Sequence, residues 1–377
     1  MTSRSRLHPA LAALLLWTTA ALAQTDTPAP AALSPETLAR DLRAASGAPA
    51  VGVGWYRNGG MRIATAGVRA RGTDAAADRQ DLWHIGSNGK AMTATLAARL
   101  VEAGVIGWND TVGQRLGDLS PRAAYRDVTL DMLLAHRGGV VANVGFFSAR
   151  SFVGSLSDRD VVKDRRDYAR EVLGKDPVAE PGTEFVYSNA GYVVAGAMIE
   201  AATGQSWEEL IDAWVFEPLD METAGFGAPG NAVTLSQPRG HGGPFPWSRG
   251  AVAPGPEADN IPALGPAGTI HMSLRDHLKF LRAHLERPQG FLGRDSWNRL
   301  QDDVQGQSYA LGWALRDTGA LVHAGSNTLW FNIVLVDPER GIAVVLSAND
   351  GAAGRVRPAM EQTLTRMLPA LAPAAGQ

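Results

Sequence analysis

The chain has 377 residues, of which 45% are hydrophobic and 19% charged, and its basic and acidic side chains nearly balance to a formal net charge of −3. This composition is too apolar for a disordered chain, and the near neutrality argues against a nucleic-acid backbone as the main partner. The absence of cysteine excludes thiol catalysis, cysteine-ligated zinc and disulfides.

The first 23 residues have the pattern of a cleaved export signal. Arg4 and Arg6 precede a short apolar run at 10–20, and Ala21-Leu22-Ala23 is a small-x-small cleavage site. The run is shorter than the ~20 residues of a membrane-spanning helix. We therefore expect cleavage after Ala23, no stable membrane span in the mature chain, and a periplasmic or secreted protein; an uncleaved anchor is the alternative. Residues 24–33, rich in Ala, Pro and Thr, are expected to form a linker.

Local patterns predict helices and strands along the rest of the chain. Ser34-Pro35 begins a helix, with the serine as N-cap and the proline as first helical residue. Alternating residues at 50–56 and 61–68 flank the turn Arg57-Asn58-Gly59-Gly60 and predict a β-hairpin. Apolar spacing predicts further helices at 92–103, 129–135, 192–203, 207–214, 274–285 and 352–367, and short antiparallel strands at 310–315, 321–324, 329–336 and 342–347.

Strands thus lie near both ends of the chain and helices fill the middle. The simplest architecture is an α/β fold of the α+β type, in which one antiparallel sheet from both chain ends is flanked by helices and a central helical domain is inserted. Segment 225–268 is rich in Gly and Pro with little periodicity, and we expect it to overhang a binding site. The expected bounds are 34–368 for the whole domain, about 34–90 and 270–368 for the sheet part, about 91–269 for the helical part, and 369–377 for a tail.

Most catalytic and cofactor motifs are missing or incomplete, including the Gly-x-Ser-x-Gly elbow, dinucleotide and phosphate loops, and any metal-binding spacing among the histidines. We therefore expect no metal and no cofactor. One motif remains, Ser87-x-x-Lys90, directly before a strong helical pattern. Positions three apart on a helix are neighbours, so the Lys90 amine would lie beside the Ser87 hydroxyl. A lysine can take the serine proton if burial or neighbouring cations lower its pKa from ~10.4.

Two later segments carry further candidate residues. Tyr187 and Asn189 precede an apolar helix. A tyrosine near a lysine cation can ionise below its usual pKa of ~10 and act as a second base. An asparagine amide can orient the amine and bind a substrate carbonyl. His323, Gly325 and Ser326 end a predicted strand, whose edge can offer a backbone N–H to an oxyanion. Taken singly, a core tyrosine and a hydrogen-bonded structural histidine are the alternatives.

Together and in this order, these elements resemble the penicillin-recognising serine hydrolases. That family contains class C β-lactamases, low-molecular-weight penicillin-binding proteins, and esterase and D-aminopeptidase relatives. The resemblance covers about residues 36–366 and implies the β-lactamase/transpeptidase-like fold, with the active site between the sheet and the helical domain. The matching segments are Ser87-x-x-Lys90, Tyr187-x-Asn189 and His323-Ala324-Gly325, supported by 83–86, 133–139 and 265–268.

The resemblance also implies a role for each residue. Ser87 would be the acylated nucleophile, and Lys90 and Tyr187 would share the general-base and general-acid work, with Tyr187 also activating the deacylating water. Asn189 would bind Lys90 and the carbonyl side chain of the substrate. The backbone N–H groups of Ser87 and Ser326 would form the oxyanion hole.

The third motif departs from the Lys-Thr-Gly that is usual in β-lactamases and transpeptidases. Here it reads His323-Ala324-Gly325. A histidine is mostly neutral at pH 7, and the alanine has no hydroxyl. Because a charge-assisted hydrogen bond contributes ~1.5–3 kcal/mol, the change would weaken β-lactam recognition roughly ten- to hundredfold. An arginine from elsewhere, such as Arg239 or Arg249 in the loop-rich segment, could supply the missing charge.

The sequence therefore predicts an exported serine acyl-hydrolase that cleaves a small-molecule ester, a small amide or a D-amino-acid peptide through an acyl-enzyme on Ser87. A true β-lactamase or D-Ala-D-Ala carboxypeptidase is the first alternative. A non-catalytic family member that acts as a binding or scaffold protein is the second, and a metallohydrolase is disfavoured by the histidine spacing.

Overall fold

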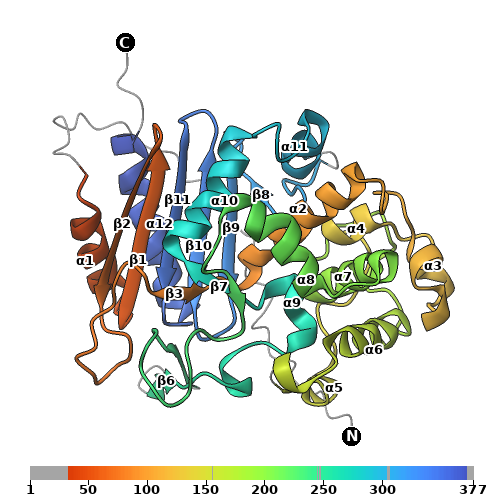
Figure 1. Cartoon of the computed structure of the whole chain (residues 1–377), viewed down its shortest axis with the longest axis horizontal. Helices are drawn as coiled ribbons and strands as arrows, with labels where there is room; N and C mark the ends of the chain where they lie inside the picture. Colours follow the sequence, from red (N-terminus) through yellow and green to blue (C-terminus); the bar gives the residue numbers. More distant parts are fainter. Residues whose placement is uncertain (1–32, 155, 244, 246–247, 304–305, 372–377) are drawn as a thin grey trace, which may run out of the picture. The chain divides into compact units, whose positions relative to one another are not determined.

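A computed structural model describes residues 33–371 of the chain, apart from 155, 244, 246–247 and 304–305. The predicted export signal at 1–23 and nearly all of the predicted linker lie outside these described residues. Within the described part, the expected mixture of an antiparallel sheet and helices is confirmed, with strands supplied by both ends of the chain (Figure 1).

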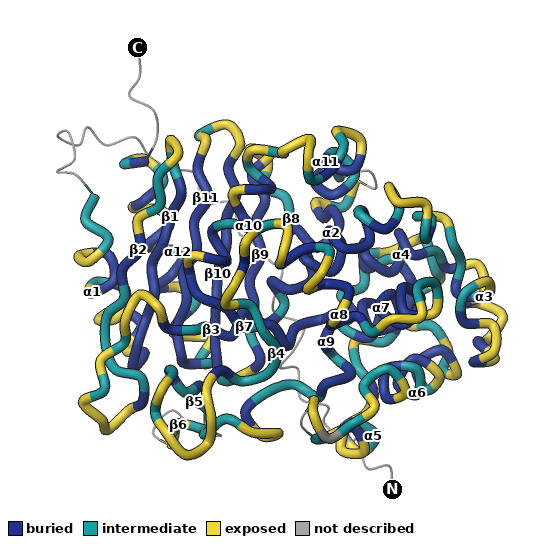
Figure 2. Tube along the Cα trace, viewed as in Figure 1, coloured by how far each residue is buried: buried dark blue, intermediate teal, exposed yellow. Residues whose placement is uncertain are grey.

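The main sheet has six antiparallel strands in the order β2-β1-β11-β10-β9-β8. The hairpin β1–β2 turns at Asn58 and Gly59, whose φ angles of 49° and 76° fit the left-handed turn of a tight hairpin. The central strands are buried along nearly their whole length (Figure 2), which is why they read as continuous apolar runs. The strands are β1 (Ala50–Arg57), β2 (Gly60–Gly67), β8 (Ala314–Leu315), β9 (Leu321–Ser326), β10 (Phe331–Asp337) and β11 (Ile342–Ala348).

Helices cover both faces of this sheet. Helix α10 (Leu274–Glu286) packs on β1, β10 and β11, and α1 (Pro35–Ser46) and α12 (Ala353–Leu371) pack together on the opposite face (Figure 1). The predicted N-cap Ser34 is present and accepts from the backbone of Thr37, and Ser273 caps α10 in the same way by accepting from the backbone of Asp276. Helix α12 continues to Leu371 and so includes the first residues of the predicted tail.

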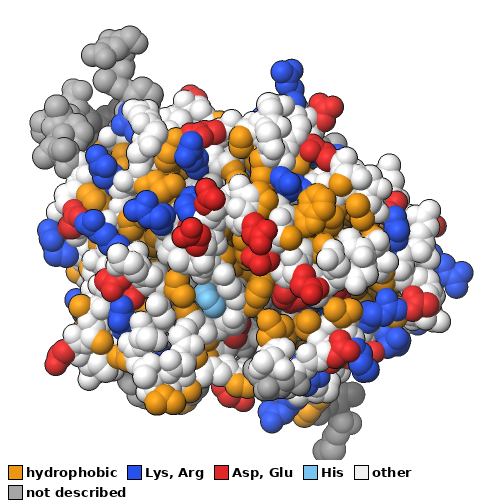
Figure 3. Space-filling view, viewed as in Figure 1, with side chains coloured by type: hydrophobic (Ala, Val, Ile, Leu, Met, Phe, Trp, Pro, Cys, Tyr) orange, Lys and Arg blue, Asp and Glu red, His pale blue; other side chains and the backbone are white. Residues whose placement is uncertain are grey.

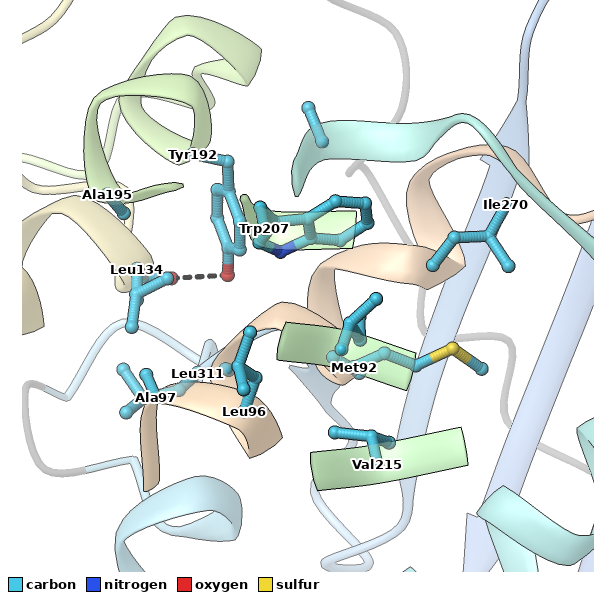
Figure 4. Close-up of a cluster of buried hydrophobic side chains, with 14 of the residues drawn as sticks. Met92, Leu96, Ala97, Leu134, Tyr192, Ala195, Trp207, Val215, Ile270 and Leu311 are labelled. Atoms are coloured by element: carbon cyan, nitrogen blue, oxygen red, sulfur yellow. Dashed lines mark hydrogen bonds between the residues drawn. The ribbon is translucent and has the colours of Figure 1, made fainter. Parts of the chain in front are cut away.

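The middle of the chain forms the helical part beside the sheet. Helix α2 (Gly89–Glu102) runs through it and contacts α7, α8, α9 and α11. Figure 4 shows the core around α2, where Met92 and Leu96 pack among side chains from several helices. The other helices here are α3 (Val112–Arg115), α4 (Leu130–Leu134), α5 (Phe146–Arg150), α6 (Val161–Leu173), α7 (Asn189–Thr203), α8 (Trp207–Ile211), α9 (Gly265–Gly268) and α11 (Arg294–Gln301).

Two small sheets complete the described fold. One has the order β3-β7-β4 and the other is the hairpin β5–β6. The 225–268 segment, which showed little periodicity, contains β4, β5, β6, α9 and two single-turn helices, Pro256–Ala258 and Pro262–Leu264. The strands are β3 (Leu82–His84), β4 (Gly225–Phe226), β5 (Gly240–Gly242), β6 (Gly250–Val252) and β7 (Ile270–Ser273).

Several predicted elements differ from the structure. The strand expected at 310–315 forms only at Ala314–Leu315, because Gly312, with φ at 82°, turns the chain against the backbone of Ala91. The helix expected at 207–214 ends as an α-helix at Ile211 and continues as a π-turn over Asp212–Phe216.

The face in Figure 3 mixes acidic and basic side chains, as the small net charge leads one to expect.

Candidate active site

The nucleophile lies on a sharp turn between a strand and a helix. The backbone of Ile85, just after β3, donates to Ile270 of β7 at 2.9 Å, and Gly86, with φ at 53°, then redirects the chain. Residues Gly86–Asn88 form one 3-10 turn that leads directly into α2. Ser87 is the middle residue of this turn and is partly exposed.

Two glycines bring this turn against the end of β9. A Cβ on Gly86 would lie 2.4 Å from the backbone nitrogen of Ser326, and a Cβ on Gly325 would lie 2.0 Å from the carbonyl oxygen of Ile85. Neither position has room for a side chain. The contact places the peptide of Ser326 beside the residue that precedes Ser87, so the two backbone N–H groups expected to bind an oxyanion come from adjacent segments.

Lys90 is fully buried beneath the nucleophile. Its Nζ lies 3.0 Å from Ser87 Oγ, 2.7 Å from Asn189 Oδ1 and 2.8 Å from the carbonyl oxygen of Ala267. Burial lowers the pKa of the Lys90 amine well below its usual value, because the charged form loses its hydration. The expectation of a serine–lysine pair is thus met in the geometry. Ala267 belongs to segment 265–268, which supported the resemblance, but its contact with Lys90 was not predicted.

Helix α7 brings Asn189 to the lysine. Ser188 is the N-cap and accepts from the backbone of Gly191 at 2.8 Å, so Asn189 is the first residue of the helix. The Asn189 amide nitrogen donates to Asn143 Oδ1 at 3.1 Å, which turns its oxygen toward Lys90. Asn143 was not singled out in the sequence, and it fixes the orientation of the Asn189 amide.

Tyr187 lies next to Ser87 and Lys90, but the prediction that its hydroxyl ionises below the usual pKa is wrong. Burial raises the pKa of the Tyr187 hydroxyl above its usual value, and the opposing effect of Ser87 is smaller. The hydroxyl makes no hydrogen bond of normal geometry to a described residue. Lys90 Nζ lies 5.0 Å from the centre of the Tyr187 ring. With its own charge disfavoured by burial, this lysine does not favour a phenolate, and Tyr187 stays protonated.

His136 lies in segment 133–139, which supported the resemblance, but the sequence analysis gave it no role in the site. Its Nδ1 accepts from the backbone of Ser188 at 3.0 Å, and its carbonyl oxygen accepts from Val186 at 2.8 Å, so it holds the chain on both sides of Tyr187. The centres of the His136 and Tyr187 rings lie 4.3 Å apart. Burial lowers the pKa of His136 well below its usual value, so the ring is neutral. His136 adopts φ of 59°, a conformation that no sequence pattern signalled.

His323 is buried under the nucleophile turn. Its Nδ1 lies 3.3 Å from Asn88 Oδ1 and its Nε2 lies 3.3 Å from the Tyr309 hydroxyl. Because Asn88 Oδ1 only accepts, Nδ1 carries the proton and Nε2 accepts from Tyr309. Burial and the neighbouring Lys90 lower the pKa of His323 to about 3. The histidine is therefore neutral and satisfied within the protein, and it does not offer the positive charge of a lysine.

The two arginines considered as replacements for that charge have partners elsewhere. Arg249 Nε lies 2.7 Å from Asp350 Oδ1, and its Nη2 donates to the carbonyl oxygen of His241. Arg239 donates to the carbonyl oxygen of Ala232 at 3.1 Å.

Among the described residues, no group of three or more His, Asp or Glu side chains could hold a metal ion. No helix in the same residues combines the length and apolar character needed to cross a membrane.

Comparison with known proteins places this site in a family. A model of the beta-lactamase family matches residues 36–364, so the chain belongs to the beta-lactamase family, whose members include penicillin-binding proteins and serine hydrolases. The chain is 26% identical over 342 residues to penicillin-binding protein 4 of Amycolatopsis lactamdurans. The alignment covers 83% of this chain and 84% of the relative. It spans about half the length of other curated relatives that it matches.

Solved structures share the fold at low sequence identity. The octameric penicillin-binding protein homologue from Pyrococcus abyssi superposes with a TM-score of 0.72 at 24% identity, covering 88% of this chain and 76% of that chain. The D-amino acid amidase of Ochrobactrum anthropi gives a TM-score of 0.71 at 20% identity, covering 89% and 97%. The β-lactamase/transpeptidase-like fold is therefore confirmed, and the chain is a serine hydrolase by family.

Proposed function

We propose that this protein is an exported serine acyl-hydrolase that cleaves an ester or a small amide, such as a D-amino-acid amide or peptide, through an acyl-enzyme on Ser87. The contact of Lys90 Nζ with Ser87 Oγ at 3.0 Å, inside a buried site that depresses the lysine pKa, carries the proposal. An amine in this environment can be neutral near pH 7 and can take the serine proton.

Acylation would begin when Lys90 takes the proton of the Ser87 hydroxyl while Oγ attacks the substrate carbonyl carbon. The carbonyl oxygen becomes an oxyanion, which the backbone N–H groups of Ser87 and Ser326 would stabilise. Collapse of this intermediate reforms the carbonyl and breaks the bond to the alcohol or amine. That leaving group takes a proton from the Lys90 ammonium, directly or by way of the Tyr187 hydroxyl.

Deacylation would repeat the sequence with water as nucleophile. Water loses a proton to the Lys90–Tyr187 pair and attacks the acyl carbon, and Ser87 Oγ leaves and regains its proton. The raised pKa of Tyr187 supports a role for its hydroxyl as proton donor and relay and not as a standing phenolate. Asn189 would hold Lys90 in place and offer its amide to the acyl side chain of the substrate.

Ester and amide substrates without a carboxylate beside the reacting carbonyl suit this site best. His323 is neutral, Ala324 has no hydroxyl and Arg249 is paired with Asp350. The usual recognition of a β-lactam carboxylate by a fixed charge therefore has no counterpart among these residues. The structural similarity to a D-amino acid amidase supports the amide part of the proposal.

The test is labelling with a fluorophosphonate probe together with hydrolysis of a p-nitrophenyl ester. Wild type should be labelled on Ser87 and should hydrolyse the ester, and Ser87→Ala should lose both. Ser151→Ala is the matched control, because Ser151 is an exposed serine away from the Lys90 contacts, and it should behave as wild type. Retained turnover in Ser87→Ala would reject the acyl-enzyme proposal.

An enzyme that reacts with β-lactams, either a β-lactamase or a D-Ala-D-Ala carboxypeptidase, is the second candidate, favoured by the match to a penicillin-binding protein over most of both chains. Intact-mass spectrometry after brief mixing with a penicillin separates the two candidates. A penicilloyl adduct on wild type but not on Ser87→Ala would show that the site accepts β-lactams. Absence of an adduct, with the penicillin unconsumed and the ester hydrolysed, would leave the ester or amide hydrolase.

Export rests on the composition of residues 1–23 alone. N-terminal sequencing of protein recovered outside the cytoplasm should show Gln24 as its first residue. An intact Met1 on that protein would reject cleavage after Ala23.

A further inference from the structure

One carboxylate in the Gly/Pro-rich segment connects the two sides of the site. Asp259 lies between the single-turn helices Pro256–Ala258 and Pro262–Leu264, and only 8% of its side chain is exposed. Its Oδ1 faces three groups: His84 Nε2 at 2.6 Å, Asn327 Nδ2 at 3.2 Å and the backbone nitrogen of Asn260 at 2.6 Å. His84 and Asn327 belong to the two chain segments that present the candidate oxyanion donors.

The first connection leads to the nucleophile turn. His84 is fully buried at the end of β3, and its Nδ1 accepts from the backbone of Gly86 at 3.1 Å. Because Nδ1 accepts, the ring proton lies on Nε2, the nitrogen that faces Asp259. The two atoms are in close polar contact, but the contact does not have the geometry of a hydrogen bond. Asp259 thus fixes the ring that holds the residue directly before Ser87.

The second connection leads to the end of β9. Asn327 follows Ser326 and is buried. Its Nδ2 donates to Asp259 Oδ1 at 3.2 Å and to the carbonyl oxygen of Ala258 at 3.3 Å, while its Oδ1 accepts from the backbone of Leu329 and of Trp330, both at 3.2 Å. The amide therefore spans the turn between β9 and β10. Asp259 anchors one end of it, so the carboxylate acts on the position of the Ser326 peptide.

A third contact strengthens the same region. The side chain of Asn260 donates to the carbonyl oxygen of Gly268 at 2.7 Å. Gly268 lies against the nucleophile turn, since a Cβ on it would be 2.7 Å from the carbonyl carbon of Gly86 and 3.1 Å from the backbone nitrogen of Ser87. The loop at 259–260 thus supports the peptide of Ser87 from two directions.

We propose that Asp259 is a positioning residue of the oxyanion hole: by holding His84 and Asn327 on one oxygen, it sets the spacing between the backbone N–H groups of Ser87 and Ser326. This inference rests on the proposed serine acyl-hydrolase function. Oxyanion donors act through preorganised geometry, and a displacement of about 1 Å costs on the order of a hundredfold in rate. Asp259 touches none of the reacting groups, so its effect is indirect.

The test compares Asp259→Ala and Asp259→Asn with wild type on a neutral p-nitrophenyl ester, and measures inhibition by phenylboronic acid. The boronic acid forms a tetrahedral adduct on an active serine and places an oxygen in the oxyanion hole. Asp259→Ala should lower kcat about 10- to 100-fold with KM nearly unchanged, and should weaken boronic acid binding by the same factor. Asp259→Asn keeps one oxygen but loses the charge. Its kcat and its boronic acid binding should lie between those of wild type and Asp259→Ala.

Glu257→Ala is the matched control, because Glu257 is an exposed acidic residue of the same loop, and it should keep wild-type kcat and inhibition. A folded Asp259→Ala with wild-type kcat overturns the inference, as does a fall in kcat without weaker boronic acid binding. If Asp259→Ala does not fold, wild-type values in Asp259→Asn overturn it. A wild type that is never labelled on Ser87 rejects the proposed function itself, whereas an active wild type and an unaffected Asp259→Ala reject only this inference.

Discussion

Lys90 Nζ lies 3.0 Å from Ser87 Oγ, and its two other contacts are oxygens that can only accept a hydrogen bond, Asn189 Oδ1 and the carbonyl of Ala267. A neutral amine has two hydrogens and one lone pair. The two hydrogens satisfy these acceptors, and the lone pair is left to face the Ser87 hydroxyl. The protein therefore orients Lys90 as a base for one specific proton.

The pH profile should report this base. Burial lowers the pKa of Lys90 well below its usual value, so the neutral, active form is present at lower pH than for an exposed lysine. We expect kcat/KM for an ester to rise with pH through the depressed pKa and then level off. Lys90→Met should lower kcat by about 10²- to 10⁴-fold and abolish this rising limb. Lys279→Met, a lysine on α10 away from these contacts, is the control, and a limb that persists in Lys90→Met would contradict the assignment.

Gly325 should tolerate no side chain. In Gly325→Ala the new Cβ would lie 2.0 Å from the carbonyl oxygen of Ile85 and 3.0 Å from the backbone nitrogen of Asn88, which forces β9 away from the nucleophile turn. We expect the free energy of unfolding to fall by about 1–3 kcal/mol. We also expect ester hydrolysis to fall by more than this loss of folded protein explains. Gly354→Ala, where the added Cβ meets no atom within 4 Å and the residue lies in α12, should leave the activity unchanged and should not lower the free energy of unfolding. Denaturant unfolding and ester hydrolysis measure the two effects, and wild-type activity in Gly325→Ala would refute the close approach.

Ser87, Lys90 and Asn189, which the structure brings together, could be picked out from the sequence because they lie in short ordered motifs. The serine–lysine spacing follows from helix geometry, and Asn189 stands directly before an apolar helical pattern. Residues that act through a backbone carbonyl or a second contact left no such pattern. Ala267 acts through its peptide oxygen, and Asn143 acts only by orienting another amide.

The fold was predicted best where one face of an element is apolar. The hairpin β1–β2 and helix α10 lie within a few residues of their predicted bounds. Helix α6 was missed because its buried face includes Asp164 and Arg165, whose charges are satisfied by ion pairs and so break the apolar periodicity. The altered ionisation of Tyr187 could not be predicted either, because it depends on burial and not on neighbours in the chain.

His136 should matter for catalysis through the position of Tyr187. His136→Asn retains an acceptor close to the place of Nδ1 and suits the φ of 59°, whereas His136→Phe retains the ring contact with Tyr187 and loses the acceptor for Ser188. We expect His136→Phe to lower kcat about tenfold or more with little change in KM, and His136→Asn to lower it less. Steady-state kinetics separate the two variants. Equal losses would show that ring packing, and not the hydrogen bond, holds Tyr187.

The buried cluster of Arg165, Glu200 and Glu208 should make stability depend on pH. Arg165 is fully buried and donates to both glutamates, and burial raises the pKa of Glu200 from 4.5 to about 7 despite this arginine. Because the folded pKa exceeds the unfolded one, folding takes up a proton between these values. The stabilisation is complete below pH 4.5, declines as pH rises, and is lost above about pH 7, with a total on the order of 3 kcal/mol.

Glu200→Gln mimics the protonated side chain at every pH and leaves Glu208 to pair with Arg165. The variant should therefore lose most of the decline in unfolding free energy between pH 4.5 and pH 7 that wild type shows. Urea unfolding at several pH values in this window measures the slope. Glu217→Gln, at an exposed position, should keep the wild-type slope. If Glu200→Gln also keeps it, the pH dependence arises from another group, and Glu200 is ionised in the folded protein with its charge neutralised by Arg165.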